Sequence, residues 1–522
     1  MGQSMVLGLL NVKAVNTLTP LWLVGIGALA GVVLVVLFFV LLWGLSAIPG
    51  LSRLRRSVQE SWSVVREGVL FYVLVVLLVY GGIGLLGTFM LRPVGESMSI
   101  LASLPRLTQV GTEEHTATVP KGPAAASPDD VMVGEAHEVP VQFRGEELTQ
   151  LEITSTENLS VSYDPTAEVN TLDSVNVKAG EKFTWRRRPN TQSPFGEEPI
   201  DRLYIHNLGV DDATISIVTH TDVVHPEVRS IVITALGVFG LFLVYFLQHA
   251  LVPRLSAIAL ATFKSEVAQP LFIIIMGLGL CFLLLSIYIP YNTFGEDIKM
   301  LKDSGLTLIR VFCIALAVWG ASTTLADEIE GKTALTVLSK PVRRRSFVIG
   351  KFFGIGWTTA LMFVILGAVL LAVTSYKMIY DARETSQEVP TWQACYLEMS
   401  SVVPGLMLAF METLVLAALS VAISTRLPMF ANFMICFTVY VLGHLIPLIS
   451  QATEGRFEIV KFVGRFSAAI FPNLEAFDLQ TAIAAGIAVP KEYLGWSLLY
   501  CILFSIVAML LALILFEDRD LA

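Results

Sequence analysis

Charge is scarce in this sequence. Asp, Glu, Lys and Arg together make up 15% of its 522 residues, whereas soluble globular chains carry about 25%. Hydrophobic residues make up 54% of the chain, and the mean hydropathy is +0.69. This balance excludes an ordinary soluble protein and indicates a membrane protein.

Cysteine is sparse as well. The five cysteines that are present do not have the spacing of a zinc site or of a disulfide framework. Four lie in apolar runs, where a thiol behaves as a small hydrophobic group, and Cys395 stands alone in a predicted external loop. The one candidate metal group is His220, Asp222 and His225. The sequence does not decide whether these three residues bind a metal or are solvated side chains at the end of a strand.

A phosphate-binding loop is also missing. Gly331-Lys332-Thr333 matches the end of a P-loop, but the first glycine of that motif would fall on Ala326. A long apolar run precedes it, where a P-loop would need a strand. The chain therefore lacks the nucleotide site of an ATPase, and we expect no enzyme activity of its own.

Long apolar runs dominate what is present. A membrane-crossing helix needs about 20 apolar residues. Nine runs approach or exceed that length, near 21–45, 68–91, 228–251, 269–290, 305–326, 353–375, 404–424, 429–450 and 493–516. No small-residue cleavage site follows the first run, so we expect a retained helix there and not a cleaved signal. The sequence predicts a polytopic α-helical membrane protein with about nine transmembrane helices.

Lysine and arginine in short loops indicate the orientation, because such loops stay on the cytoplasmic side. Two loops, 51–68 and 326–351, are rich in both residues. Nine spans then place the N-terminus outside and the C-terminus inside. The predicted external segments are 92–227, 291–304, 376–403 and 451–492.

The segment 92–227 differs from the rest of the chain. Pro, Ala, Gly and Ser are frequent in 111–136, which we interpret as a linker. Six following stretches alternate apolar and polar residues between turn residues and predict a small extracytoplasmic all-β sandwich. Residues 93–227 hold 22 acidic and 9 basic residues, a net charge of −13, whereas the remaining chain is +4. The acidity indicates solubility or, alternatively, attraction of cationic ligands.

Four regions follow from these patterns. A two-helix region spans 1–91, the linker and β domain span 92–227, a third helix spans 228–251, and a six-helix core spans 252–522.

The loop 327–345 has the pattern of a docking element. Acidic residues follow a membrane helix, Gly331 permits a bend, and a short helix would present Leu335 and Leu338. Pro341 would end that helix, because proline lacks the backbone N–H. Arg343 then begins a basic run that leads into the next span. The competing interpretation is a basic turn that only sets topology.

The stretch "DEIEGKTALTVLSKPVRRRSFVIGK" (327–351) resembles the signature of ABC-2 type (type-2 ABC exporter) permeases. "RLSAIALATFKSEVAQP" (254–270) resembles the elbow helix before their first core helix, and "FPNLEAFDLQ" (471–480) resembles the external segment before the last. The likeness covers about 250–522. It is nearest the multicopper-enzyme-maturation and gliding-type subgroup, whose tail is similar to "FEDRDL". Residues 1–249 are additional to the six-helix form.

The resemblance implies a permease subunit in the bacterial plasma (inner) membrane that has no cofactor and binds no nucleic acid. Its implied partners are a separate ABC ATPase, a second permease copy or paralogue, and the lipid bilayer. It implies that Leu335 and Leu338 anchor the ATPase, that Glu328 and Glu330 are charged partners, and that the arginines lie at the membrane surface. The implied coupling residues are Asp327, Glu328, Glu330, Gly331, Thr333, Leu335, Leu338, Pro341, Arg343, Arg345 and Lys351.

Two ionisable residues stand out inside the predicted spans, where charge is costly and often functional. Glu412 is a candidate for lining a path or the permease dimer interface. The alternative is a packed side chain bonded to Thr413 or Ser420, or one that snorkels to the surface. His444 is interpreted as structural, because the nearby Pro447 would mark the end of its helix.

Two other functions compete with a transporter subunit. A scaffold would transmit force from a cytoplasmic ATPase to the external domain and act on envelope proteins without transporting a substrate. A secondary transporter would need several intramembrane charges and paired broken helices. Glu412 and His444 are too few for that.

Overall fold

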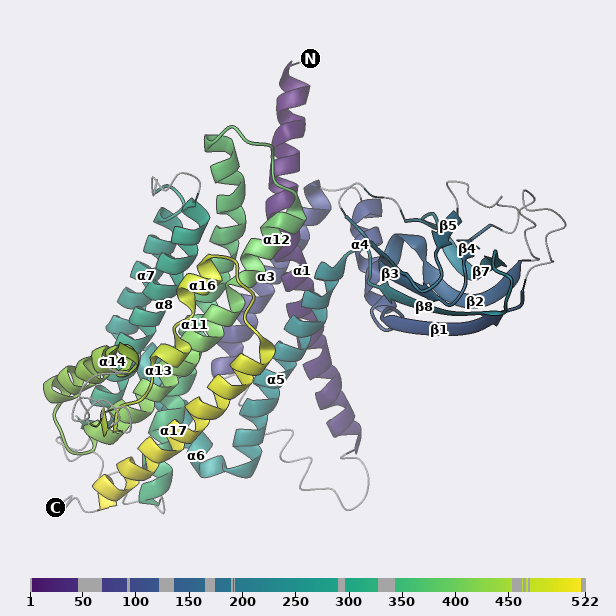
Figure 1. Cartoon of the computed structure of the whole chain (residues 1–522). Coiled ribbons are helices and arrows are strands. Elements are labelled where there is room, and N and C mark those ends of the chain that lie inside the picture. Colours follow the sequence, from purple (N-terminus) through teal and green to yellow (C-terminus); the bar gives the residue numbers. More distant parts are fainter. Residues whose placement is uncertain are drawn as a thin grey trace. The chain divides into compact units, whose positions relative to one another are not determined.

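Figure 1 shows the computed structural model of the chain. It describes residues 2–45, 68–91, 94–121, 136–164, 174–188, 191, 193–289, 296–326, 343–452, 462, 466–467 and 470–517. The chain divides into two compact units. Met1–Arg92 with Ser230–Ala522 form the helical unit, and Pro93–Arg229 form the β unit.

The helical unit is built from helices, most of which are long and apolar. They are α1 (Gly2–Leu45), α3 (Val69–Leu91), α5 (Arg229–Leu251), α6 (Pro253–Val267), α7 (Pro270–Leu285), α8 (Asp297–Ala321), α11 (Arg344–Glu384), α12 (Trp392–Ser401), α13 (Val403–Ser424), α14 (Met429–Ala452) and α17 (Lys491–Glu517). A π-helical turn, η3 (Ser322–Ala326), extends α8.

Seven helices within the described residues are long and apolar enough to cross a membrane: α1, α5, α8, α11, α12 with α13, α14 and α17. The pair α6 and α7, bent by 65°, would make an eighth span, and α3 is a shorter apolar helix over its described length. The prediction of a mostly helical, multi-pass protein with a separate β region is confirmed at this level. The count of nine spans stays a prediction.

The surface of the helical unit explains its composition. Large apolar side chains remain exposed along α17, among them Leu503, Val507 and Leu510. Such a continuous apolar face is unfavourable in water and suits contact with lipid. The inner faces of the helices instead enclose a hydrophobic core that includes Phe263 and Leu366.

Helix α6 packs closely against α11 because α11 carries glycine where the two meet. A Cβ added at Gly350 would lie 2.8 Å from the Ile258 Cβ, and one at Gly354 would lie 2.5 Å from the Thr262 Cβ. Two small residues four positions apart on one helix face allow such an approach in membrane helices.

The β unit contains eight strands in two antiparallel four-stranded sheets. The strands are β1 (Thr112–Val119), β2 (His137–Arg144), β3 (Leu148–Ser155), β4 (Leu159–Ser162), β5 (Ser174–Val177), β6 (Lys182–Arg186), β7 (Pro199–Asn207) and β8 (Ala213–Thr221). Their orders are β1-β8-β3-β6 and β2-β7-β4-β5. Alternating apolar residues from both sheets, such as Ile153 and Ile205, form one core.

Two details of the β unit differ from the sequence prediction. Residues 112–119, interpreted as part of a linker, form β1, whose "TEEHTATV" pairs with β8 along its full length. Most of its residues are exposed, so its polar composition hid it. The stretch 174–185, predicted as one strand segment, turns at Gly180 (φ 71°) and gives β5 and β6 in different sheets.

The helix α4 (Val94–Arg106) belongs to the β unit. Arg106 at its end forms an ion pair with Glu147, whose side chain is 3% exposed. The hydrogen bond that Arg106 donates to Glu147 raises the pKa of Arg106, so the guanidinium stays charged. This pair ties α4 to the turn before β3.

Candidate functional site: a buried charge cluster

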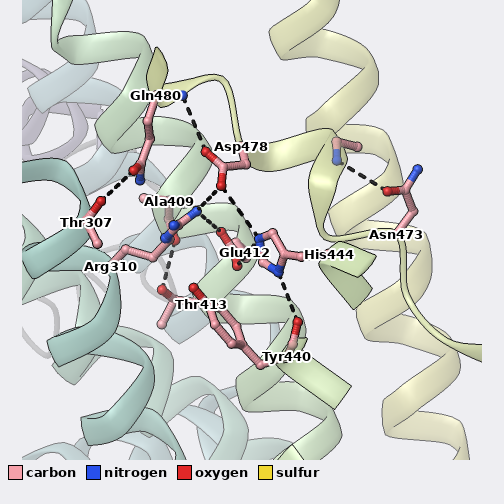
Figure 2. A network of polar contacts seen from close by, with 11 residues as sticks. Thr307, Arg310, Ala409, Glu412, Thr413, Tyr440, His444, Asn473, Asp478 and Gln480 are labelled. Atoms are coloured by element: carbon pink, nitrogen blue, oxygen red, sulfur yellow. Dashed lines mark hydrogen bonds and ion pairs between the residues drawn. The ribbon is translucent and has the colours of Figure 1, made fainter. Parts of the chain in front are cut away.

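Four ionisable side chains from four separate parts of the chain meet inside the helical unit (Figure 2). Arg310 comes from α8, Glu412 from α13 and His444 from α14. Asp478 comes from the segment 471–480 that precedes the last helix. Because each lies on a different element, the cluster links the three helices to this segment.

The arginine lies between the two carboxylates. Arg310 Nη1 is 3.0 Å from Asp478 Oδ2 and 3.5 Å from Glu412 Oε2. The exposed fraction of the side chain is 0% for Glu412 and 8% for Arg310. A charge buried this deeply is tolerated when an opposite charge neutralises it.

The two ring nitrogens of His444 face different groups. Its Nδ1 lies 2.9 Å from the Tyr440 carbonyl oxygen, which can only accept, so Nδ1 carries the hydrogen. Nε2 faces Glu412 Oε1 at 3.5 Å and Asp478 Oδ2 at 3.9 Å. His444 therefore faces the same two carboxylates as Arg310.

The cluster is loosely bonded. Glu412 Oε1, Arg310 Nε and His444 Nε2 are buried and have no hydrogen-bond partner within the described residues. Buried polar groups are usually paired, and incomplete pairing marks places where an arrangement can change. The geometry suits an electrostatic latch whose members can separate or exchange partners.

The segment 471–485 is held on the helices by further polar contacts. Pro447 lacks an N–H, which leaves the Gly443 carbonyl without its helical partner. The backbone N–H of Leu474 donates to that oxygen at 3.1 Å. Thr307 of α8 donates to Gln480 at 2.7 Å, as Figure 2 shows. We call residues 471–485 the cap segment.

A second buried cation lies at the same segment. Lys302 on α8 has a side chain that is 1% exposed, and its Nζ lies 2.7 Å from Glu398 Oε2. Nζ also donates to the Ile483 carbonyl oxygen at 3.4 Å. Two buried cations of α8, Lys302 and Arg310, therefore contact the cap segment.

The structure brings the two predicted intramembrane residues together. Glu412 and His444 form part of one cluster, although nothing in their sequence positions predicts this pairing. The alternative partners of Glu412 are otherwise engaged: Thr413 donates to the Ala409 carbonyl oxygen, and Ser420 contacts Asn432. Glu412 is also too buried to snorkel.

The argument that Pro447 ends the helix of His444 is wrong. Helix α14 continues to Ala452 with Pro447 inside it. The contact between Leu474 and Gly443 satisfies the carbonyl that proline leaves unbonded, so the helix need not stop.

Most predicted coupling residues lie outside the described residues: Asp327, Glu328, Glu330, Gly331, Thr333, Leu335, Leu338 and Pro341. Arg343 and Arg345 are exposed at the start of α11. Lys351 is 7% exposed, and its Nζ lies 5.5 Å from the centre of the Phe347 ring. The Lys351 side chain is therefore packed inside the helical unit and is not presented at its surface.

The candidate metal group does not assemble. His220 Nδ1 contacts Thr112 Oγ1 at 2.8 Å, and Asp222 pairs with Arg229 at 2.7 Å. No group of three or more His, Cys, Asp or Glu side chains suited to a metal occurs in the part of the chain that the structure describes. Cys395, expected in an external loop, is fully buried in α12.

Sequence reasoning missed Arg310, Asp478 and Lys302. Arg310 lies within the predicted span 305–326 and is an intramembrane charge by the rule that selected Glu412. Asp478 was assigned to an external loop, and no periodicity indicates that this loop reaches a helix interior.

Comparison of the chain with protein-family models, curated proteins and solved structures gave no match.

Proposed function

We propose that the chain is the transmembrane permease subunit of an ABC transporter of the exporter type, driven by a separate ATPase that docks on residues 327–345. ATP-dependent closure of the ATPase would push this coupling segment and rock the helices between two states. The six-helix core would be α7, α8, α11, α13, α14 and α17, with α6 as the elbow.

The observation that carries the proposal is the position of α6 beside both ends of the coupling segment. Before the segment, Trp319 of α8 donates to Gln269 at 3.0 Å, and Gln269 donates to Thr323 at 3.3 Å. Thr323 in turn donates to Glu266 at 3.4 Å. These bonds tie the junction of α6 and α7 to the helix that enters the segment.

After the segment, α11 packs on α6 through Gly350 and Gly354. A force on the coupling segment would therefore reach α6 through both α8 and α11. This mechanical arrangement supports a driven permease and has no evident use in a loop that only sets topology.

At the other side of the core, the charge cluster would serve as the latch of the cap segment. Arg310 and Lys302 hold the cap to α8, and His444 holds it to α14, while Glu412 of α13 joins the cluster through Arg310 and His444. A relative shift of these helices separates the charges and releases the cap. We place the cap and the β unit on the extracytoplasmic side of the plasma membrane.

The proposal predicts that Leu335→Ala/Leu338→Ala loses the ATPase without losing the fold. Each well-buried apolar anchor contributes about 1–3 kcal/mol, so complex formation should weaken at least about tenfold. The tagged chain is purified from native membranes, and co-purified ABC ATPase is quantified by mass spectrometry. Leu236→Ala/Leu243→Ala, on the exposed face of α5, is the matched control. Unchanged co-purification of the first variant would contradict the docking role.

A further inference from the structure

A basic pocket lies where the start of α11 meets the end of α17. Its volume is 330 Å³, and it is lined by Arg343, Arg344, Arg345, Leu513, Phe516 and Glu517. The lining contains three arginines and one glutamate, so it carries a net positive charge. Arg344 Nη1 donates to the Glu517 carbonyl oxygen at 3.1 Å, which fixes one wall of the pocket.

The pocket continues into an apolar groove. A second cavity, of 380 Å³, lies between α11, α13 and α17 and shares Leu513 with the basic pocket. Phe352 and Phe353 of α11 line one side, and Ile502 and Ile506 of α17 line the other. A charged pocket and an apolar groove that meet at one residue match a ligand with an anionic head and a hydrocarbon tail.

The length of the groove agrees with this chemistry. Along α17 it extends from Leu513 to Cys501, which is about 18 Å at 1.5 Å per residue. The hydrocarbon core of a bilayer is about 30 Å thick, so one leaflet offers about 15 Å. An acyl chain of one leaflet would therefore fill the groove while its headgroup lies among the arginines.

We propose that this pocket and groove bind one phospholipid with an anionic headgroup. Phe516, which lines the pocket, is held in place by its stacking on Phe347, with ring centres 6.0 Å apart. Basic pockets at the membrane surface bind anionic headgroups through charge and bidentate hydrogen bonds. The site depends on described side chains of the helical unit alone and does not require the ATPase.

The experiment is native mass spectrometry of the full-length chain in detergent, titrated with palmitoyl-oleoyl phosphatidylglycerol or phosphatidylcholine. The wild type should prefer phosphatidylglycerol. Arg344→Gln/Arg345→Gln should weaken its binding about tenfold or more, because each arginine near an anionic lipid contributes to affinity. Arg254→Gln/Arg426→Gln removes two exposed arginines from other places and should leave binding unchanged.

A second pair of variants tests the groove. Ile506→Trp would fill it, whereas Val507→Trp places the same bulk at an exposed position that does not line it. Only Ile506→Trp should weaken binding of phosphatidylglycerol. All four variants should keep the unfolding temperature of the wild type, which separates lost binding from lost folding.

Three results would overturn the assignment. Equal binding of the two lipids by the wild type would exclude an anionic-lipid site. Competition by millimolar inorganic phosphate, with Ile506→Trp binding as well as the wild type, would indicate a soluble anion. A preference that emerges only after residues 518–522 are deleted would assign the pocket to the acidic tail of the chain itself.

Discussion

At the scale of single residues, the cluster around Arg310 combines high burial with incomplete pairing. The guanidinium faces two carboxylates, and His444 approaches the same two from the other side. Buried ion pairs seldom add much net stability, because desolvation offsets their attraction. Removing one member alone is costly, since it leaves the others uncompensated.

We therefore predict that Arg310→Met destabilises the chain by about 3–5 kcal/mol, because the buried Glu412 and the partly exposed Asp478 lose their shared cation. Adding Glu412→Met should recover part of this loss, with a coupling energy of at least about 1 kcal/mol. Thermal or denaturant unfolding in detergent gives the free energy of unfolding of the wild type, the two single variants and the double variant. The exposed Arg254→Met is the control. Strictly additive effects would show that Arg310 and Glu412 do not interact.

The residue scale is also where sequence reasoning was least complete. Glu412 and His444 were recognisable as charges in apolar runs, but Arg310, which pairs with Glu412, was not singled out. Asp478 follows "FPNLEAF", whose polar residues indicate a loop, and only the folded chain carries it to α8. Contacts between residues far apart in sequence depend on which helices are neighbours, and hydropathy does not encode that.

At the scale of elements, the glycines of α11 set how closely α6 can approach. The resemblance to permeases predicted an elbow helix near 254–270, and a helix with a 65° bend after it lies there. The packing of this helix on α11 was not predicted. The two glycines of "GKFFG" (350–354) indicate close helix packing only once α6 is known to lie beside them.

Gly354→Leu should therefore displace α6 and destabilise the helical unit by about 1–3 kcal/mol, the usual cost of overpacking. The new Cβ would meet the Thr262 Cβ at 2.5 Å. Gly237→Leu is the matched control, since an added Cβ there meets nothing within 4 Å. Unfolding temperatures of the two variants in detergent give the comparison. Equal stabilities would contradict close packing of α6 on α11.

The β strands show the same contrast between local and distant information. Alternation of apolar and polar residues located most strands of the β unit, because each has one face in the core. Strand β1 escaped detection, since it is exposed over most of its length and its pairing with β8 joins residues about 100 positions apart.

At the scale of the whole molecule, the predicted orientation can be tested at positions that the structure exposes. Cys395 is unsuitable as a reporter, because its side chain is fully buried. Ser386 lies in the exposed turn after α11, and Arg426 lies in the exposed turn between α13 and α14. With nine spans these two turns lie on opposite sides of the membrane.

In a variant without the native cysteines, Ser386→Cys should react with a membrane-impermeant maleimide in intact cells. Arg426→Cys should react only after the membrane is permeabilised, because its basic turn stays in the cytoplasm. Labelling is measured by gel shift. Reaction of both cysteines from the same side would refute the predicted arrangement of spans.

The central claim is that a separate ATPase drives this chain through residues 327–345. The most direct measurement places a photo-crosslinking amino acid at Leu338 and irradiates native membrane vesicles with and without ATP. A control has it at Leu427, an exposed apolar residue in another short turn. We expect an adduct between position 338 and an ABC ATPase, with a yield that changes with ATP. An adduct with lipid alone, or equal adducts from both positions, would contradict it.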